Sequence, residues 1–132
     1  MNKVQHFGEH LTIDGYGGSV ELLNDRERVE KVLFELPEIL KMNRLSEPEV
    51  ILAPENDVKD PGGWSGFVVI AESHISLHTF PRRRFVSADV YTCKNGLDVD
   101  LVIEYFKEKF ALDSVEQNFI IRGKNYPKEN LV

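Results

Sequence analysis

The chain has 132 residues, which is enough for one ordinary domain and too few for two. Its 16 Lys and Arg residues against 22 Asp and Glu residues give a net charge of −6, the wrong sign for a general binder of nucleic acid or anionic membranes. The sequence has no membrane-length apolar run and no signal-peptide core near its start. The single cysteine, Cys93, excludes an internal disulfide framework and a cysteine-based zinc site. We therefore expect one cytoplasmic domain over residues 1–132.

The first third of the chain predicts one strand followed by one helix. Residues 10–16 alternate apolar and polar side chains, which is typical of a half-buried strand. Asn24 followed by Glu27 resembles a helix N-cap, and apolar residues then recur at helical spacing. We expect a helix over about residues 25–42, kinked or ended early by Pro37.

The middle of the chain predicts short strands separated by turns. One run is rich in β-branched residues and others alternate apolar and polar side chains, while Pro, Gly and Asn mark the breaks between them. The strands are expected at residues 49–53, 65–71, 74–79 and 85–93.

The last part of the chain predicts a second helix and a final strand. Asp98 is placed to cap a helix whose apolar face includes Val102 and Phe106, and residues 114–122 follow as a strand. The expected order is β-α-β-β-β-β-α-β, and strands joined by short turns pair antiparallel. We therefore expect an α+β fold, a two-layer sandwich in which two helices cover one face of an antiparallel sheet.

Several polar clusters have simple structural explanations when considered alone. The glycine-rich residues 15–18 lack the Lys and Ser/Thr of a phosphate-binding loop and predict a turn. His74 and His78 on one strand would lie about 13 Å apart, too far to share a metal ion. The arginines at 82–84 are typical of a solvated turn, with a local anion site as the alternative.

Two segments carry a more specific pattern. Residues 65–81 read SGFVVIAESHISLHTFP and residues 87–93 read SADVYTC. They combine Glu72-Ser73-His74 at a strand junction, a histidine five residues after the serine, and a Val-Tyr-Thr-Cys run that ends twenty residues after it. This combination resembles the prokaryotic S-adenosylmethionine decarboxylase proenzyme family, and the resemblance extends over about residues 8–123.

The resemblance implies that the chain cleaves itself between Glu72 and Ser73, into a β chain of residues 1–72 and an α chain of residues 73–132. The Ser73 hydroxyl attacks the Glu72 carbonyl and turns the amide into an ester. Elimination and hydrolysis then leave a pyruvoyl group at residue 73. This group forms a Schiff base with the substrate amine and accepts the electrons that remain when CO2 leaves. The implied cofactor is pyruvoyl, without metal or pyridoxal phosphate, and the implied role is polyamine (spermidine) synthesis.

The resemblance also assigns roles to three further residues. Cys93 is the implied proton donor to the substrate's α-carbon, a role that suits a thiol because its ordinary pKa of about 8.5 leaves it mostly protonated at neutral pH. His78 is the implied acceptor of the serine α-proton during elimination, and Ser65 assists processing. On a straight strand Ser73 and His78 face opposite sides and lie about 16 Å apart. Either the chain bends sharply at Ser73, or the histidine comes from the neighbouring subunit of the homodimer that the family implies.

The substrate-binding part of the pattern departs from the family. Where the family has Thr-Trp-Pro-Glu, this chain has Thr79-Phe80-Pro81-Arg82. Phe80 can still stack on an adenine ring, but Arg82 cannot accept hydrogen bonds from ribose hydroxyls as a glutamate can. A further aromatic position of the family is occupied by Lys59, and Trp64 is the nearest substitute.

Three hypotheses about function follow from this mixture. The first is decarboxylation of S-adenosylmethionine, and the second is the same chemistry on arginine or ornithine. A cationic substrate of the second kind needs an acidic side chain, for which the sequence offers Glu47, Glu49, Asp57, Asp60 and Asp89. The third hypothesis is an unprocessed homologue without enzymatic activity.

Overall fold

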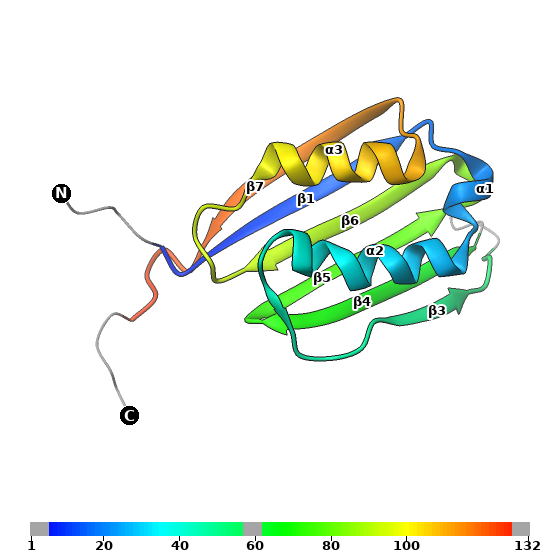
Figure 1. Cartoon of the computed structure of the whole chain (residues 1–132). Helices are drawn as coiled ribbons and strands as arrows, with labels where there is room; N and C mark the ends of the chain where they lie inside the picture. The colour runs from blue at the N-terminus through cyan, green and yellow to red at the C-terminus, as the bar shows by residue number, and fades with distance from the viewer. Residues whose placement is uncertain (1–5, 57–61, 128–132) are drawn as a thin grey trace.

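A computed structural model of the chain describes residues 6–56 and 62–127, and these form two layers (Figure 1). Seven strands make one antiparallel sheet in the order β2-β4-β5-β6-β1-β7, with β3 also paired to β4. The strands are β1 (Gly8–Tyr16), β2 (Asn43–Arg44), β3 (Glu49–Ala53), β4 (Gly63–Ala71), β5 (Ser73–Phe80), β6 (Phe85–Thr92) and β7 (Ser114–Arg122).

The helices form the second layer. Figure 1 shows α2 (Arg26–Ile39) and α3 (Val99–Phe110) side by side over one face of the sheet, which confirms the predicted α+β sandwich. The short α1 (Val20–Leu23) precedes α2, and a 3-10 turn, η1 (Pro81–Arg83), joins β5 to β6. Among the described residues, no helix has both the length and the apolar character needed to cross a bilayer.

Local signals set the helix boundaries. The Asp25 carboxylate caps α2 by accepting hydrogen bonds from two backbone N–H groups of the first turn. Pro37 lies in the last turn and α2 ends at Ile39, so the early end expected from Pro37 is confirmed and the outer bound at residue 42 was too late. The four residues of α1 were missed because one helical turn is too short to show a periodic pattern. For α3, the Asp98 carboxylate accepts from Leu101 N–H as expected.

The predicted strands lie where the structure has them, but several were predicted too short at their N-terminal ends. β1 begins at Gly8, β4 at Gly63 and β5 at Ser73, where the predicted strands began at residues 10, 65 and 74. These ends are held by pairing with neighbouring strands, as at Gly8 with Arg122, and local alternation carries no sign of such pairing. The two residues of β2 were missed for the same reason.

The two faces of the sheet differ in what covers them. On β5, Ile75 and Leu77 are fully buried beneath the helices, together with large core side chains of α3 such as Phe106. The alternate residues face the other side, which no helix of the described chain covers (Figure 1). We call this side the open face, and its central residues are His10, Ser65, Phe67, Val69, His74, Ser76, His78, Ser87, Asp89 and Tyr91.

Candidate active site

Three of the predicted site residues meet at the turn between β4 and β5. Ser73 opens β5 opposite Thr92, the last residue of β6, so Cys93 lies next to it. The Ser73 hydroxyl is 3.7 Å from the Cys93 sulfur, and the backbone N–H of Cys93 donates to the Glu72 carbonyl at 3.3 Å. We call Glu72, Ser73 and Cys93 the tip site. It brings together a hydroxyl, a thiol and a carbonyl whose oxygen already accepts a hydrogen bond.

The backbone at Ser73 has an unusual conformation. Its φ of +137° lies in a region that L side chains rarely occupy. Such conformations cost of order 1–3 kcal/mol and gather at functional sites, where the surrounding structure holds them. At Ser73 the holding contacts are the ladder pairs with Ile70 on β4 and Thr92 on β6.

The segment after Cys93 is held by a buried carboxylate. Glu9 on β1 is only 5% exposed, and its oxygens accept from the backbone N–H groups of Gly96 (3.1 Å) and Leu97 (2.9 Å). Burial opposes ionisation of Glu9, but these two bonds and His6 outweigh it and lower its pKa below the ordinary value. The Glu9 carboxylate therefore fixes the loop that carries Cys93.

A second pair of predicted residues meets further along the same hairpin. Ser65 on β4 lies directly opposite His78 on β5, and the Ser65 hydroxyl shares a 2.8 Å hydrogen bond with Nδ1 of His78. We call Ser65 and His78 the base site. β5 pairs without interruption with β4 from Ser73 to His78 and with β6 from Ser73 to Phe80, so it does not bend between the two sites. About 16 Å of extended strand separates Ser73 from His78 within one chain.

The predicted substrate-binding residues continue from the base site. Phe80 ends β5, and its ring lies 5.4 Å from that of Phe85. Arg82 follows in η1, and its Nη1 is 2.8 Å from Oε2 of Glu55, both side chains being largely exposed. Glu55 was not among the residues expected from the sequence, because its partner is 27 residues away and only the folded loop brings the two together.

The remaining candidates from the sequence lie elsewhere. Trp64 packs against the core and its indole N–H donates to the Asn24 carbonyl at 3.0 Å, so it does not share the open face with Phe80. Glu47 lies 3.8 Å from Arg44, and Glu49 stands opposite Phe67. The other candidates Asp57, Lys59 and Asp60 lie outside the described residues.

A cluster of possible metal ligands lies on the open face. His10, His74 and Asp89 place one ligand atom each within 4.8 Å of the others in the described part of the chain. Arg122, which can only donate, lies 2.8 Å from Nδ1 of His10, so in the neutral ring Nε2 carries the proton and donates to Asp89 at 2.7 Å. Asp89 also accepts from Ser76. These contacts favour a hydrogen-bond network over metal ligation. From the sequence, His74 and His78 were expected to lie too far apart to share a metal ion, and the contact of His74 and Asp89 with His10 was not anticipated.

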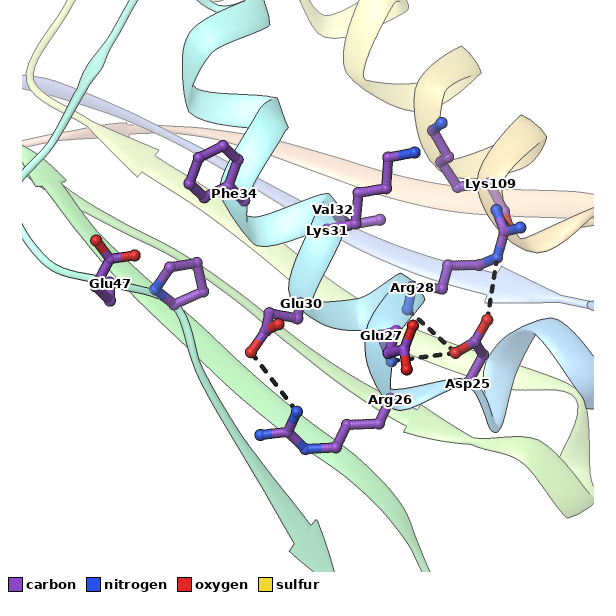
Figure 2. Close-up of a pocket in the computed structure, with 11 residues that line it drawn as sticks. Asp25, Arg26, Glu27, Arg28, Glu30, Lys31, Val32, Phe34, Glu47 and Lys109 are labelled. Atoms are coloured by element: carbon purple, nitrogen blue, oxygen red, sulfur yellow. Dashed lines mark hydrogen bonds and ion pairs between the residues drawn. The ribbon is translucent and has the colours of Figure 1, made fainter.

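A cleft of about 950 Å³ lies beside α2, away from the β4–β5 hairpin, and of the candidates above only Glu47 lines it (Figure 2). Its charged side chains largely neutralise one another, as in the Arg26–Glu30 pair at 3.6 Å. Figure 2 shows Asp25 capping the first turn of α2 beside Arg28. None of the residues that resemble the decarboxylase pattern lines this cleft, so we place the candidate active site on the β4–β5 hairpin.

Known proteins resemble this chain over most of its length. The family profile described as S-adenosylmethionine decarboxylase matches residues 9–123. The chain is 31% identical over 121 residues to a protein of Clostridium botulinum named S-adenosylmethionine decarboxylase proenzyme, covering 92% of this chain and 98% of that protein. Proteins of the same name from Thermococcus gammatolerans and Brevibacillus brevis are 29% and 31% identical, covering 93% and 89% of this chain and 81% and 83% of theirs.

The fold has a match among solved structures. The crystal structure of the adenosylmethionine decarboxylase from Aquifex aeolicus superposes with a TM-score of 0.78, covering 96% of this chain and 98% of that chain at 23% identity. This likeness supports the fold, while the profile match and the curated relatives establish the relationship. The chain belongs to the S-adenosylmethionine decarboxylase family.

Proposed function

We propose that this chain is a self-processing decarboxylase that cleaves itself between Glu72 and Ser73 and uses the resulting pyruvoyl group to decarboxylate S-adenosylmethionine in the cytoplasm. The observation that carries the proposal is the tip site. The nucleophile, the carbonyl it attacks and the proton donor lie within one cluster, with 3.7 Å between the Ser73 oxygen and the Cys93 sulfur.

The backbone of the tip site suits the first step of processing. Attack by the Ser73 hydroxyl on the Glu72 carbonyl forms the C–O bond of an ester and breaks the C–N bond of the peptide. Negative charge develops on the Glu72 oxygen, which already accepts from Cys93 N–H. Cleavage also removes the constraint that holds φ of Ser73 at +137°. Products of 72 and 60 residues remain joined through the pairing of β4 with β5.

The residues around the tip site fit a pyruvoyl group at position 73. Such a group supplies a ketone that takes up the substrate amine and the electrons released with CO2. The Cys93 thiol stands beside that position and can deliver a proton to the substrate's α-carbon. Glu9, through the loop of Gly96 and Leu97, keeps the thiol in place.

We propose that a homodimer completes the active site. Each chain carries one tip site and one base site on the same hairpin, too far apart to act together. In this dimer the open faces of the two subunits face one another. The two-fold axis lies between the two sheets and brings the base site of one subunit towards the tip site of its partner. The open face exposes the large apolar side chains of Phe67 (39%) and Val69 (38%), which such an interface would bury.

Glu55 supports S-adenosylmethionine as the substrate despite the missing family glutamate. The Arg82 guanidinium holds one Glu55 oxygen at 2.8 Å and leaves the other available. A carboxylate in this place can accept hydrogen bonds from the ribose hydroxyls, which Arg82 itself cannot do. Arginine or ornithine remains the second candidate because the same carboxylate could bind a cationic side chain.

Intact-mass spectrometry followed by release of labelled CO2 tests the proposal. We expect the purified chain to give two fragments, of 72 and 60 residues, with the smaller blocked at its N-terminus. A Ser73→Ala variant should remain one polypeptide. Carboxyl-labelled S-adenosylmethionine, arginine and ornithine are then compared in parallel, and we expect release from the first.

An intact chain that stays intact after prolonged incubation would show the unprocessed, non-enzymatic homologue instead. Cleavage together with release from arginine or ornithine alone would keep the chemistry and replace the substrate. Cleavage without release from any of the three would overturn the decarboxylase assignment for these substrates.

A further inference from the structure

β7 forms one edge of the sheet and is an unusually open one. Its nine residues pair with β1 along their whole length, from Ser114 opposite Tyr16 to Arg122 opposite Gly8, without a bulge. In the described part of the chain no strand pairs with its other side. Such an edge presents a row of backbone donors and acceptors to any strand that can align with it.

The opposite edge of the sheet shows how this hazard is normally limited. There, β2 has two residues and β3 has five, and Pro48 and Pro54 flank β3. β7 contains neither proline nor lysine, and its Phe119 and Ile120 are each 43% exposed. A long, regular and partly apolar edge strand without these protections is typical of a site for strand addition.

The sequence of β7 is complementary to itself. When two β7 strands pair antiparallel around Phe119, Glu116 of each copy faces Arg122 of the other, and the two Phe119 rings face one another. Glu116 and Arg122 both lie on the open-face side, as shown by their partners Asp14 and Gly8 on β1. Opposite charges and aromatic rings in facing positions both stabilise a strand pair.

The neighbouring register is less favourable. Pairing around Asn118 would place Ser114 opposite Arg122 and Glu116 opposite Ile120, without an ion pair. The existing contacts of the two charged groups do not prevent the first register. Arg122 lies over the Tyr91 ring and uses Nη1 for His10, and Glu116 uses Oε1 for Tyr16, so each still has further hydrogen-bonding atoms to offer.

We propose that β7 is an interface through which two copies of this chain pair edge to edge, antiparallel and centred on Phe119. The two-fold axis of this pair runs perpendicular to the sheet at Phe119 and joins two sheets into one. Both open faces point to the same side and stay free, so the interface is independent of the homodimer proposed above.

Disulfide trapping tests the register directly. In a Cys93→Ser background, Phe119→Cys introduces the only thiol of the chain, and the paired β7 strands should crosslink through it under mild oxidation. Glu116→Cys is the matched control on the same edge. In the proposed register its two copies lie six residues apart, about 20 Å, and should not crosslink. Equal crosslinking of the two variants, or none at position 119, would overturn the proposal.

The mass in solution separates this interface from the one on the open face. Phe119→Lys should halve the assembly mass measured by light scattering, whether the starting assembly is a dimer or a tetramer. Phe67→Lys on the open face should instead leave the disulfide crosslink of the Phe119→Cys variant intact. A Phe119→Lys variant that folds, by circular dichroism, and keeps the wild-type mass would refute edge pairing even if the open-face dimer stands.

Discussion

The two ends of the β4–β5 hairpin hold different parts of the proposed active site. At the turn, Ser73 and Cys93 lie together against a carbonyl that is already hydrogen-bonded. Towards the other end, Ser65 and His78 share a hydrogen bond on the open face, followed by Arg82. In the proposed mechanism, the first end holds the groups that react, and the second holds the groups that move a proton or contact the substrate.

The two ends also differ in how firmly they are held. The turn is fixed by strand pairing on both sides of Ser73 and by the buried Glu9 carboxylate behind the Cys93 loop. At the other end the Arg82 and Glu55 side chains are 72% and 63% exposed and fix little by themselves. Under the proposed function, one chain preorganises the turn, while the exposed end depends on the partner subunit to enclose it.

Mixing two inactive precursors would give the sharpest test of this division. His78→Ala alone should fail to cleave, and Ser73→Ala alone cannot cleave. If His78 acts across the dimer, a mixed dimer combines an intact tip site on the first chain with an intact base site on the second. We expect the His78→Ala chain to be cleaved in the mixture, as measured by intact-mass spectrometry after co-refolding.

The same mixture contains its own control. The Ser73→Ala chain should remain whole in every sample, so each fragment can be assigned to its parent by mass. Keeping the mixture so dilute that the chains stay monomeric should abolish the cleavage, because no heterodimer then forms. If heterodimers are demonstrated and the mixture stays uncleaved, the base site of one subunit does not serve the tip site of the other.

Replacing the thiol should separate processing from turnover. Cys93→Ser keeps the backbone N–H that donates to Glu72, so cleavage should continue. The hydroxyl is a much weaker acid than the thiol, and loss of a positioned proton donor lowers turnover by about 10²–10⁴-fold. Fragment masses and the rate of CO2 release measure the two effects separately.

Cys93→Ala is the matched control because it also keeps the N–H group. If both variants cleave but only Cys93→Ala loses turnover, a serine hydroxyl replaces the thiol and the proposed acid is wrong. Loss of cleavage in both variants would instead show that the side chain takes part in processing.

The sequence was informative wherever the signal was local. Alternation located the strands, Asp98 marked the start of α3, and Pro37 marked the end of α2. The family pattern pointed to Ser73, Cys93, Ser65 and His78, and the register of β4, β5 and β6 then places them in two pairs.

What the sequence could not show depends on strand register or loop closure. Glu9 reaches Leu97 across 88 residues, and Glu55 reaches Arg82 from a loop that read only as a turn. The contact between His10 and Asp89 joins two residues that are 79 positions apart in the sequence. The spacing of His74 and His78 along one strand gave no indication of it. Such contacts leave no periodic trace in either segment.

The loop behind the tip site should be sensitive to the charge of Glu9. Glu9→Gln places an amide N–H₂ where the backbone N–H groups of Gly96 and Leu97 need acceptors, at a cost of about 1–3 kcal/mol. Because folding lowers the pKa of Glu9, its contribution is present above the ordinary value of 4.5 and is lost as the pH falls through the lower folded value.

Urea denaturation at pH 7 and at pH 3 measures this difference between wild type and Glu9→Gln. We expect a clear gap in unfolding free energy at pH 7 that shrinks at pH 3. Glu104→Gln, which changes a largely exposed carboxylate on α3, should behave like wild type at both values. A gap that persists unchanged at pH 3 would contradict the assigned role of the charge.

The smallest expected effect concerns substrate binding at the exposed end. Glu55→Gln keeps the shape of the side chain but weakens its ion pair with Arg82 and its hydrogen bonds from the ribose hydroxyls. We expect KM for S-adenosylmethionine to rise about tenfold, which corresponds to about 1.4 kcal/mol. Because Glu55 does not touch the reacting atoms, kcat should change little. Glu47→Gln is the matched control, since Glu47 is also exposed and lies beside an arginine, Arg44, at the cleft away from the hairpin. Steady-state CO2 release gives both constants, and equal KM values for the two variants would remove Glu55 from the substrate site.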